Sequence, residues 1–288
     1  MKTDTTSQEL KTLVKEKYSQ IADQSREANA SSCCGASCGC STIDTAIMAE
    51  DYTSLPGYHA DADLGLGCGL PTEFAQIKEG DVVIDLGSGA GNDCFVARSI
   101  VGTSGKVIGI DMTEKMIEKA RVNAEKLGFH NVEFRLGDIE KMPVSANVAD
   151  VVVSNCVLNL VPDKKRAFAE TNRILKPGGH FSVSDIVLEG TLPENLRKAA
   201  EMYAGCVSGA IQKTEYLQVI KEAGFKNITI QKERKIILPD EILREYQSEK
   251  EIQDFHSSGL NILSINVFAE KPAEEDKKKA CCGPDCCN

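Results

Sequence analysis

Short apolar runs alternate with helical patterns through the middle of the chain, and this alternation limits the fold more than any other feature. The apolar residues of segment 113–128 recur at spacings of one, three, four and three residues, which places them on one face of a helix. Strands that alternate with helices of this length predict a parallel, doubly wound α/β sheet. Because the strands are almost continuously apolar, helices should cover both faces of the sheet. We expect seven strands, at Val82–Asp85, Lys106–Asp111, Val132–Leu136, Ala149–Val153, His180–Ser184, Asn227–Gln231 and Leu263–Glu270.

A glycine-rich turn follows the first of these strands. Gly87, Gly89 and Gly91 form the pattern G-x-G-x-G. Glycines at these positions allow a tight turn and let a ligand approach the backbone closely. The spacing differs from the P-loop and from the G-x-G-x-x-G of dinucleotide sites, which present a helix N-terminus to phosphate. A nicotinamide-dependent dehydrogenase is therefore disfavoured.

Acidic and amide side chains end the next strands. Asp111 ends the second strand, where a carboxylate can accept both hydroxyls of a ribose. Asp138 follows the third strand, where a carboxylate can accept from an adenine amino group, and Asn155 ends the fourth. Carboxyl ends of strands are where open α/β sheets bind ligands. The residues expected to bind a cofactor are Asp85, Gly87, Ser88, Gly89, Gly91, Asp111, Met112, Gly137, Asp138, Ile139 and Asn155.

These features, taken in this order, resemble class I S-adenosylmethionine-dependent methyltransferases. The similarity covers roughly residues 82–185 and includes the turn Leu175-Lys-Pro-Gly-Gly179. The resemblance implies a Rossmann-like, seven-stranded α/β fold. It also implies S-adenosylmethionine as the cofactor.

Twelve cysteines are the main anomaly of the composition. Eight lie in two clusters near the ends of the chain, and Cys68, Cys94, Cys156 and Cys206 stand singly. We expect Cys94 to be a buried small hydrophobe, as cysteines within an α/β core usually are. Cys156 directly follows Asn155 and should lie beside the expected methyl donor. Glycines next to Cys68 and Cys206 should expose their sulfur atoms.

The spacing of Cys68, Cys156 and Cys206 fits no zinc motif, in which ligand pairs are about two to four residues apart. Three separated thiolates can still converge on one soft centre, because soft ligands select soft metals and metalloids. The cysteines therefore indicate a thiophilic acceptor.

The segments around these cysteines resemble arsenite S-adenosylmethionine methyltransferases. Together with the core, the likeness covers most of residues 30–235, and its most specific segments are Gly67-Cys-Gly69, Ser154-Asn-Cys-Val-Leu-Asn-Leu160 and Gly205-Cys-Val-Ser-Gly209. The resemblance implies transfer of a methyl group from S-adenosylmethionine to arsenite or its thiol conjugates, for arsenic detoxification.

Roles for individual cysteines follow from this resemblance. It implies that Cys68, Cys156 and Cys206 hold As(III). It also implies a catalytic disulfide between Cys68 and an N-terminal cysteine, for which Cys40 is the first candidate and Cys34 the second. A thioredoxin- or glutathione-type reductant would then reduce that disulfide.

Two other functions are consistent with parts of the sequence. One is a methyltransferase for an organic small molecule, with incidental cysteines. The other is a non-catalytic, thiol-rich protein that binds a metalloid. The complete cofactor pattern disfavours the second of these, and the place of Cys156 beside the methyl donor disfavours the first.

The charge and hydropathy of the chain limit its partners. Lys and Arg number 33 and Asp and Glu number 43, giving a net charge of −10. Such a chain lacks the basic surface that a nucleic-acid backbone or an anionic membrane would attract. We find no apolar run of about 18 residues and no signal-peptide core near the N-terminus. We expect a cytoplasmic monomer that binds neither nucleic acid nor membrane.

Four segments organise the chain. We expect residues 1–72 to form an N-terminal helix (residues 9–24) and a cysteine-rich loop, and residues 73–190 to form the cofactor-binding core. Residues 191–235 should complete the sheet and carry part of the metalloid site, with helices at 194–203 and 214–223. Residues 236–288 should form a C-terminal extension, either a small domain or an addition to the sheet, with a disordered cysteine-rich tail.

Overall fold

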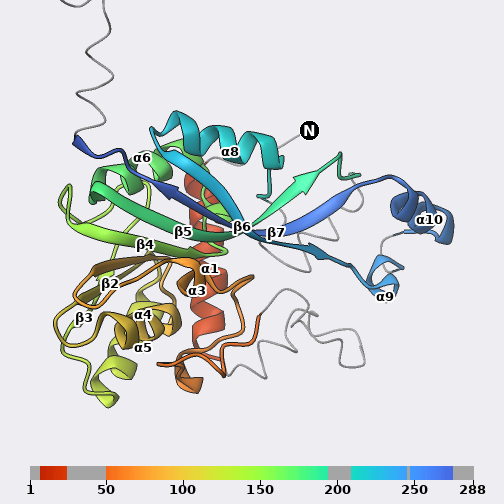
Figure 1. Ribbon diagram of the computed structural model, residues 1–288. Coiled ribbons are helices and arrows are strands. Elements are labelled where there is room, and N and C mark those ends of the chain that lie inside the picture. Colours follow the sequence, from red (N-terminus) through yellow and green to blue (C-terminus); the bar gives the residue numbers. More distant parts are fainter. Residues whose placement is uncertain (1–6, 25–49, 194–208, 245–246, 275–288) are drawn as a thin grey trace, which may run out of the picture.

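A seven-stranded sheet forms the centre of the protein (Figure 1). The computed structural model describes residues 7–24, 50–193, 209–244 and 247–274. The strand order is β3-β2-β1-β4-β5-β7-β6. The strands are β1 (Val82–Leu86), β2 (Lys106–Asp111), β3 (Val132–Leu136), β4 (Ala149–Asn155), β5 (Leu175–Glu189), β6 (Lys226–Ile236) and β7 (Asn261–Glu270).

The last strand in sequence lies inside the sheet and runs against its neighbours. β1 to β5 pair in parallel, whereas β7 is antiparallel to both β5 and β6. Residues 261–270 of the predicted C-terminal extension therefore add a strand to the sheet. Because β7 is ten residues long and pairs on both sides, β5 and β6 extend well beyond the segments predicted for them.

The turn predicted at residues 175–179 falls inside the bounds of β5. Gly178 has a φ of +82°, which suits a turn. Its N–H donates to the Lys271 carbonyl at 3.0 Å, and the Lys271 N–H donates to the Gly179 carbonyl at 2.8 Å. The chain thus turns here while staying paired with the end of β7.

Helices cover both faces of the sheet, as predicted (Figure 1). On one face, α4 (Asn92–Val101) and α5 (Glu114–Lys126) bury Phe95 and Ile117 against alternate residues of β1, β2 and β4. On the other, α6 (Lys164–Ile174) and α8 (Lys213–Glu222) bury Phe168 and Tyr216 against the remaining residues of the same strands. The predicted doubly wound α/β fold is confirmed.

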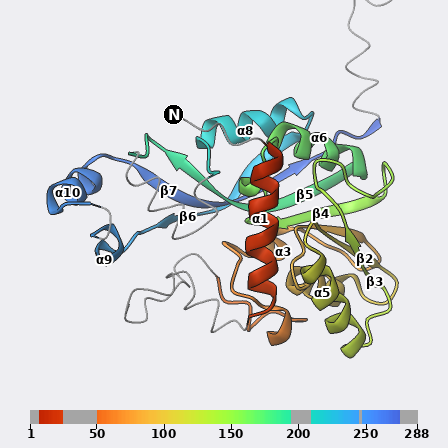
Figure 2. The same cartoon turned by 180° about the vertical axis from the view of Figure 1, so that it is seen from behind.

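The N-terminal helix α1 (Ser7–Ala22) packs beside α5 and crosses the molecule from the layer of α6 and α8 to the layer of α5 (Figure 2). Short elements that the sequence analysis did not predict are η2 (Ala60–Ala62), α3 (Pro71–Phe74), η3 (Leu158–Leu160), α9 (Asp240–Leu243) and α10 (Glu249–Ser257). The helix expected at residues 194–203 lies outside the described residues.

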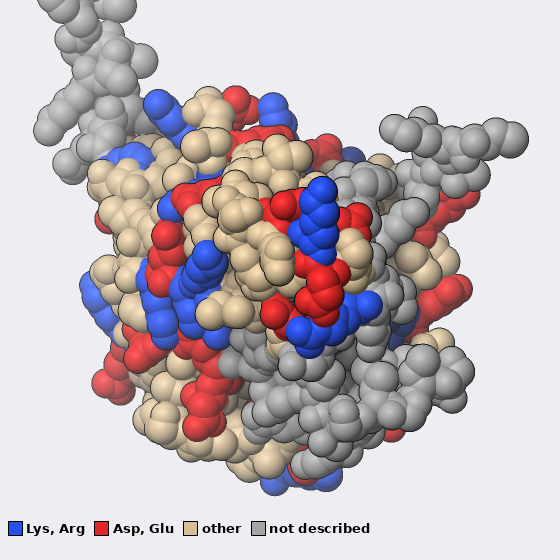
Figure 3. All heavy atoms as spheres, turned by 90° about the vertical axis from the view of Figure 1, so that its right-hand side faces the viewer, with Lys and Arg blue, Asp and Glu red and all other residues tan. Residues whose placement is uncertain are grey.

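Charged side chains of both signs are mixed on the face shown in Figure 3, where basic and acidic residues lie next to one another. Within the described part of the chain, every helix is too short or too polar to cross a bilayer.

Candidate active site

Two glycines with positive φ shape the turn between β1 and α4. Gly87 has a φ of +69°, and its N–H donates to the Ile110 carbonyl at 2.7 Å. A Cβ at Gly87 would lie 2.3 Å from Val157 Cγ2, so a larger residue would displace Val157. Gly89 has a φ of +51°, and a Cβ there would meet no protein atom within 4 Å. The turn is therefore packed against protein at Gly87 and open at Gly89.

Asp111, the last residue of β2, faces this turn. Its Oδ2 accepts from the Gly89 N–H at 3.0 Å, and its Oδ1 accepts from the Thr113 N–H at 2.8 Å. Burial raises the pKa of Asp111, and the hydrogen bonds from Thr113 and Gly89 oppose that rise. A carboxylate offers about four acceptor positions. Each oxygen thus keeps capacity for a further donor, which suits the two adjacent hydroxyls of a ribose.

Asp138 lies on the loop after β3. Its Oδ1 accepts from the Glu140 N–H at 2.8 Å, and its Oδ2 accepts from Lys11 Nζ at 2.6 Å. The side chain is 41% exposed. Asp138 is therefore held at the rim of the site with acceptor capacity remaining.

A single pocket collects most of the predicted cofactor residues at the carboxyl ends of β1 to β4. Cys156 also lines it. Asp85 and Gly91 do not: Asp85 is buried beneath the turn, where Cys94 Sγ lies 3.3 Å from its Oδ2, and Gly91 caps α4. The predicted residues that line the pocket are Gly87, Ser88, Gly89, Asp111, Met112, Gly137, Asp138, Ile139 and Asn155.

Other lining residues were not predicted from the sequence. Helix α1 contributes Lys11, Val14 and Tyr18, and the segment before β1 contributes Tyr52. The sequence predicted a helix at residues 9–24 but gave no sign that it lines the cofactor pocket. Asp63 also lines the pocket.

Tyr52, Asp93 and Asn155 form a buried polar cluster at the end of β4. The Tyr52 hydroxyl lies 2.9 Å from Asp93 Oδ1, and Asn155 Nδ2 donates to Asp93 Oδ2 at 3.2 Å. Burial raises the pKa of Asp93 to about 6, against the hydrogen bonds from Tyr52 and Asn155, which lower it. Asn155 Oδ1 accepts from the Cys68 N–H at 3.0 Å. The cluster thus ties the loop that carries Cys68 to the end of β4.

Two of the predicted arsenic ligands, Cys68 and Cys156, lie in one buried apolar cluster, so the prediction that the Cys68 sulfur is exposed is wrong. Cys156 has a φ of +59°, which is rare for a residue other than glycine, and its N–H donates to the Ser184 carbonyl at 2.8 Å. Backbone strain of this kind concentrates at functional sites. The cluster consists of Cys68, Cys156, Ile186, Leu188, Ala210, Ile236, Leu238, Leu243, Ile252 and Ile262.

The remaining predicted thiols cannot be placed beside this pair. Cys206, Cys40 and Cys34 lie outside the described residues. Within the ranges that are described, no three His, Cys, Asp or Glu side chains converge as a metal site. Cys94 is fully buried, as expected, and burial raises the pKa of its thiol.

Asp185 on β5 is a second buried carboxyl near the thiols. Its Oδ2 accepts from the Tyr216 hydroxyl at 2.9 Å. Burial raises the pKa of Asp185 to about 7, although the Tyr216 hydrogen bond and the charge of Lys164 act in the opposite direction. Asp185 is therefore partly protonated near neutral pH.

Comparison with known proteins identifies the family. A family described as "Methyltransferase domain" matches residues 77–224. An arsenite methyltransferase of Halobacterium salinarum is 37% identical over 291 residues, covering 96% of this chain and 70% of that protein. The chain belongs to the arsenite methyltransferase family. A family member from Aquipseudomonas alcaligenes is 31% identical over 270 residues, covering 91% of this chain and 74% of that protein.

A solved structure supports the same family. The crystal structure of an arsenic (III) S-adenosylmethionine methyltransferase from Chlamydomonas reinhardtii matches with a TM-score of 0.61 and 32% identity, over 72% of this chain and 68% of that one. The arsenite methyltransferase family predicted from the cysteine segments is thus confirmed. The protein is an S-adenosylmethionine-dependent methyltransferase.

Proposed function

We propose that the protein transfers the methyl group of S-adenosylmethionine to trivalent arsenic bound by cysteine thiolates, giving methylated arsenicals as a means of detoxification. The position of Cys156 carries this proposal. Cys156 lines the cofactor pocket and also belongs to the apolar cluster that contains Cys68. A thiol-bound acceptor at Cys156 would therefore lie next to the methyl donor.

The residues of the pocket fit the cofactor. Asp111 has acceptor capacity for the ribose hydroxyls, and Asp138 has it for the adenine amino group. The space beside Gly89 is open on the pocket side. When bound, S-adenosylmethionine supplies an electrophilic methyl group on a sulfonium centre.

The thiol cluster fits As(III) as the substrate. We propose Cys206 as the third ligand, because Ala210, only four residues further along the chain, packs in the cluster with Cys68 and Cys156. Four residues span at most roughly 14 Å, so the chain is long enough to bring the Cys206 thiol to both. Three soft thiolates suit a thiophilic centre that carries a lone pair.

The protein contributes to methyl transfer chiefly by positioning the arsenic relative to the methyl group. Arsenic held by three thiolates keeps a lone pair, which acts as the nucleophile. No general base is needed, because no N–H or O–H bond has to be broken. The cysteines contribute by fixing the arsenic in line with the methyl group, and such alignment can supply about 7–11 kcal/mol of the barrier. The apolar residues around Cys68 and Cys156 exclude water from this position.

A reductant completes the proposed cycle. Methylation formally takes As(III) to As(V), and two electrons are needed to reverse this. A thiol pair, Cys68 with Cys40 or Cys34, would supply them by forming a disulfide. A thioredoxin- or glutathione-type partner would then reduce that disulfide. We also propose that the enzyme is a cytoplasmic monomer.

A transfer assay tests the proposal. The full-length protein is incubated with As(III), glutathione and radiolabelled S-adenosylmethionine, and Cys156→Ser is compared with Cys94→Ser. We expect labelled methylarsenicals from the wild type and from Cys94→Ser, since Cys94 faces Asp85 away from the thiol cluster, and none from Cys156→Ser. Transfer to organic acceptors only, or As(III) binding without methyl transfer, would contradict the proposal.

A further inference from the structure

Helix α1 lies outside residues 77–224, which match the methyltransferase domain, yet it forms one wall of the cofactor pocket. Val14 is buried, and Tyr18 packs against a cluster that includes Met116 of α5. Lys11, Val14 and Tyr18 all line the pocket. The helix is therefore part of the binding site.

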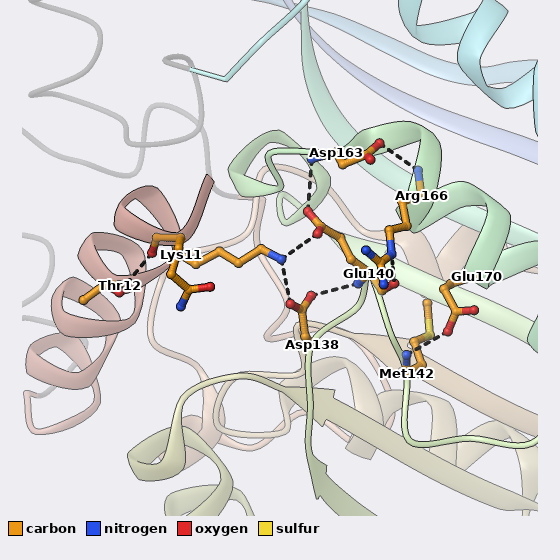
Figure 4. Close-up of polar contacts among 9 residues, drawn as sticks. Lys11, Thr12, Asp138, Glu140, Met142, Asp163, Arg166 and Glu170 are labelled. Carbon is orange, nitrogen blue, oxygen red and sulfur yellow. Dashed lines mark hydrogen bonds and ion pairs between the residues drawn. The ribbon is translucent and has the colours of Figure 1, made fainter. Parts of the chain in front are cut away.

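Lys11 joins this helix to the loop after β3 (Figure 4). Its Nζ lies 2.6 Å from Asp138 Oδ2 and 2.6 Å from Glu140 Oε2. The side chain of Lys11 is 19% exposed and that of Glu140 is 8% exposed. Water thus competes weakly for these groups. Burial alone lowers the pKa of Lys11, but the bonds to Asp138 and Glu140 outweigh it and raise the pKa.

Glu140 is itself fixed by the start of α6. Its Oε1 accepts from the Asp163 N–H at 3.0 Å, and its backbone carbonyl accepts from Arg166 Nε at 2.8 Å. Figure 4 shows these contacts running in sequence from α6 through Glu140 and Lys11 to Asp138. The ammonium of Lys11 therefore occupies a defined position, set by a rigid element.

We propose that Lys11 is a positioning residue for the adenine of the cofactor: it fixes the Asp138 carboxylate so that the remaining acceptor positions face the nucleobase. This inference rests on the proposed role of Asp138. Without Lys11, the half-exposed Asp138 would keep only the bond from the Glu140 N–H, and its Oδ2 would turn toward water. Adenine would then have to order the carboxylate as it binds, which lowers affinity.

The experiment compares two ligands across a set of variants. Dissociation constants are measured by calorimetry for S-adenosylhomocysteine and for S-inosylhomocysteine, which lacks the 6-amino group. The variants are Lys11→Met, Lys11→Arg and Asp138→Asn, with Lys15→Met as the matched control. Lys15 lies on the same helix and pairs with the exposed Glu114 at 2.7 Å. Since Lys11→Met leaves Glu140 buried without its cation, the double variant Lys11→Met/Glu140→Gln is measured as well.

We expect the wild type and Lys15→Met to prefer S-adenosylhomocysteine. Lys11→Met and the double variant should bind S-adenosylhomocysteine about tenfold more weakly and lose most of the preference for it. Lys11→Arg should restore part of that preference. Equal weakening of both ligands in the Lys11 variants, or no weakening, would overturn the inference. A different result would instead contradict the proposed adenine contact of Asp138: the wild type binds both ligands equally, and Asp138→Asn changes neither dissociation constant.

Discussion

Replacing Gly87 by alanine should destabilise the protein more than the same change at Gly89. Both residues have left-handed φ angles, +69° and +51°, a conformation that costs an L-residue about 1–2 kcal/mol. At Gly87 the new Cβ would also lie 2.3 Å from Val157 Cγ2, and such overpacking costs roughly 1–3 kcal/mol. We therefore expect the free energy of unfolding to fall by about 2–5 kcal/mol for Gly87→Ala and about 1–2 kcal/mol for Gly89→Ala.

A second substitution, at Val157, isolates the steric part of the stability lost in Gly87→Ala. Val157→Ala removes the methyl groups that the new Cβ would meet, so the double variant Gly87→Ala/Val157→Ala should cost less than the sum of the two single changes. The difference should be about 1–3 kcal/mol. Val157→Ala combined with Gly89→Ala should be additive, because nothing lies within 4 Å of a Cβ at Gly89.

Urea unfolding of the protein without cofactor measures all of these values. In a second measurement, Gly89→Ala should weaken S-adenosylmethionine binding, because its methyl group would enter space that the pocket leaves open. Equal stability losses at the two glycines, with no rescue by Val157→Ala, would show that Val157 does not crowd a side chain at position 87.

Three further predictions concern buried or pocket-lining polar groups. Asp111→Asn should weaken S-adenosylmethionine binding about 10- to 100-fold in calorimetry, since hydrogen bonds to a charged group contribute about 1.5–3 kcal/mol; an unchanged affinity would contradict the ribose contact. Tyr52→Phe should lower the free energy of unfolding by about 1–3 kcal/mol, because Asp93 and Asn155 lose a buried partner, and an unaltered denaturation midpoint would speak against this. Asp185 has a pKa raised to about 7 in the folded state, so folding binds its proton more tightly and stability should fall as pH rises from about 4 to 7, by roughly 4 kcal/mol. Asp185→Asn should reduce that dependence and leave the share contributed by Asp93, whose pKa is also raised. An identical pH profile would show that Asp185 does not contribute to it.

The sequence predicted the sheet well where local patterns decide the outcome. β1 to β5 follow from alternating apolar runs and helices. The position of β7 between β5 and β6 does not, because strand order after a crossover depends on which surfaces pack and not on any local spacing. Helix α10 did carry a local signal: Ser248 and Glu251 form a capping box at its start.

Within the site, the sequence was enough to identify the residues at strand ends. It was not enough to identify residues that distant parts of the chain bring into the pocket. Asp111 and Asp138 were located because parallel strands place their carboxyl ends together. Tyr52 meets Asp93 from 41 positions away, and Lys11 meets Asp138 from 127 positions away. No periodicity links such pairs, since only the folded structure brings them together. Asp85, predicted from the sequence to bind the cofactor, does not line the pocket, and its carboxylate lies against Cys94 at the start of α4.

Cys156 should hold the arsenic beside the cofactor pocket. X-ray absorption spectroscopy at the arsenic edge tests it most directly, with full-length protein loaded with one equivalent of As(III). We expect three sulfur ligands in the wild type and in Cys94→Ser, and the replacement of one sulfur by oxygen in Cys156→Ser. Three sulfur ligands retained in Cys156→Ser, or oxygen ligands in the wild type, would contradict it.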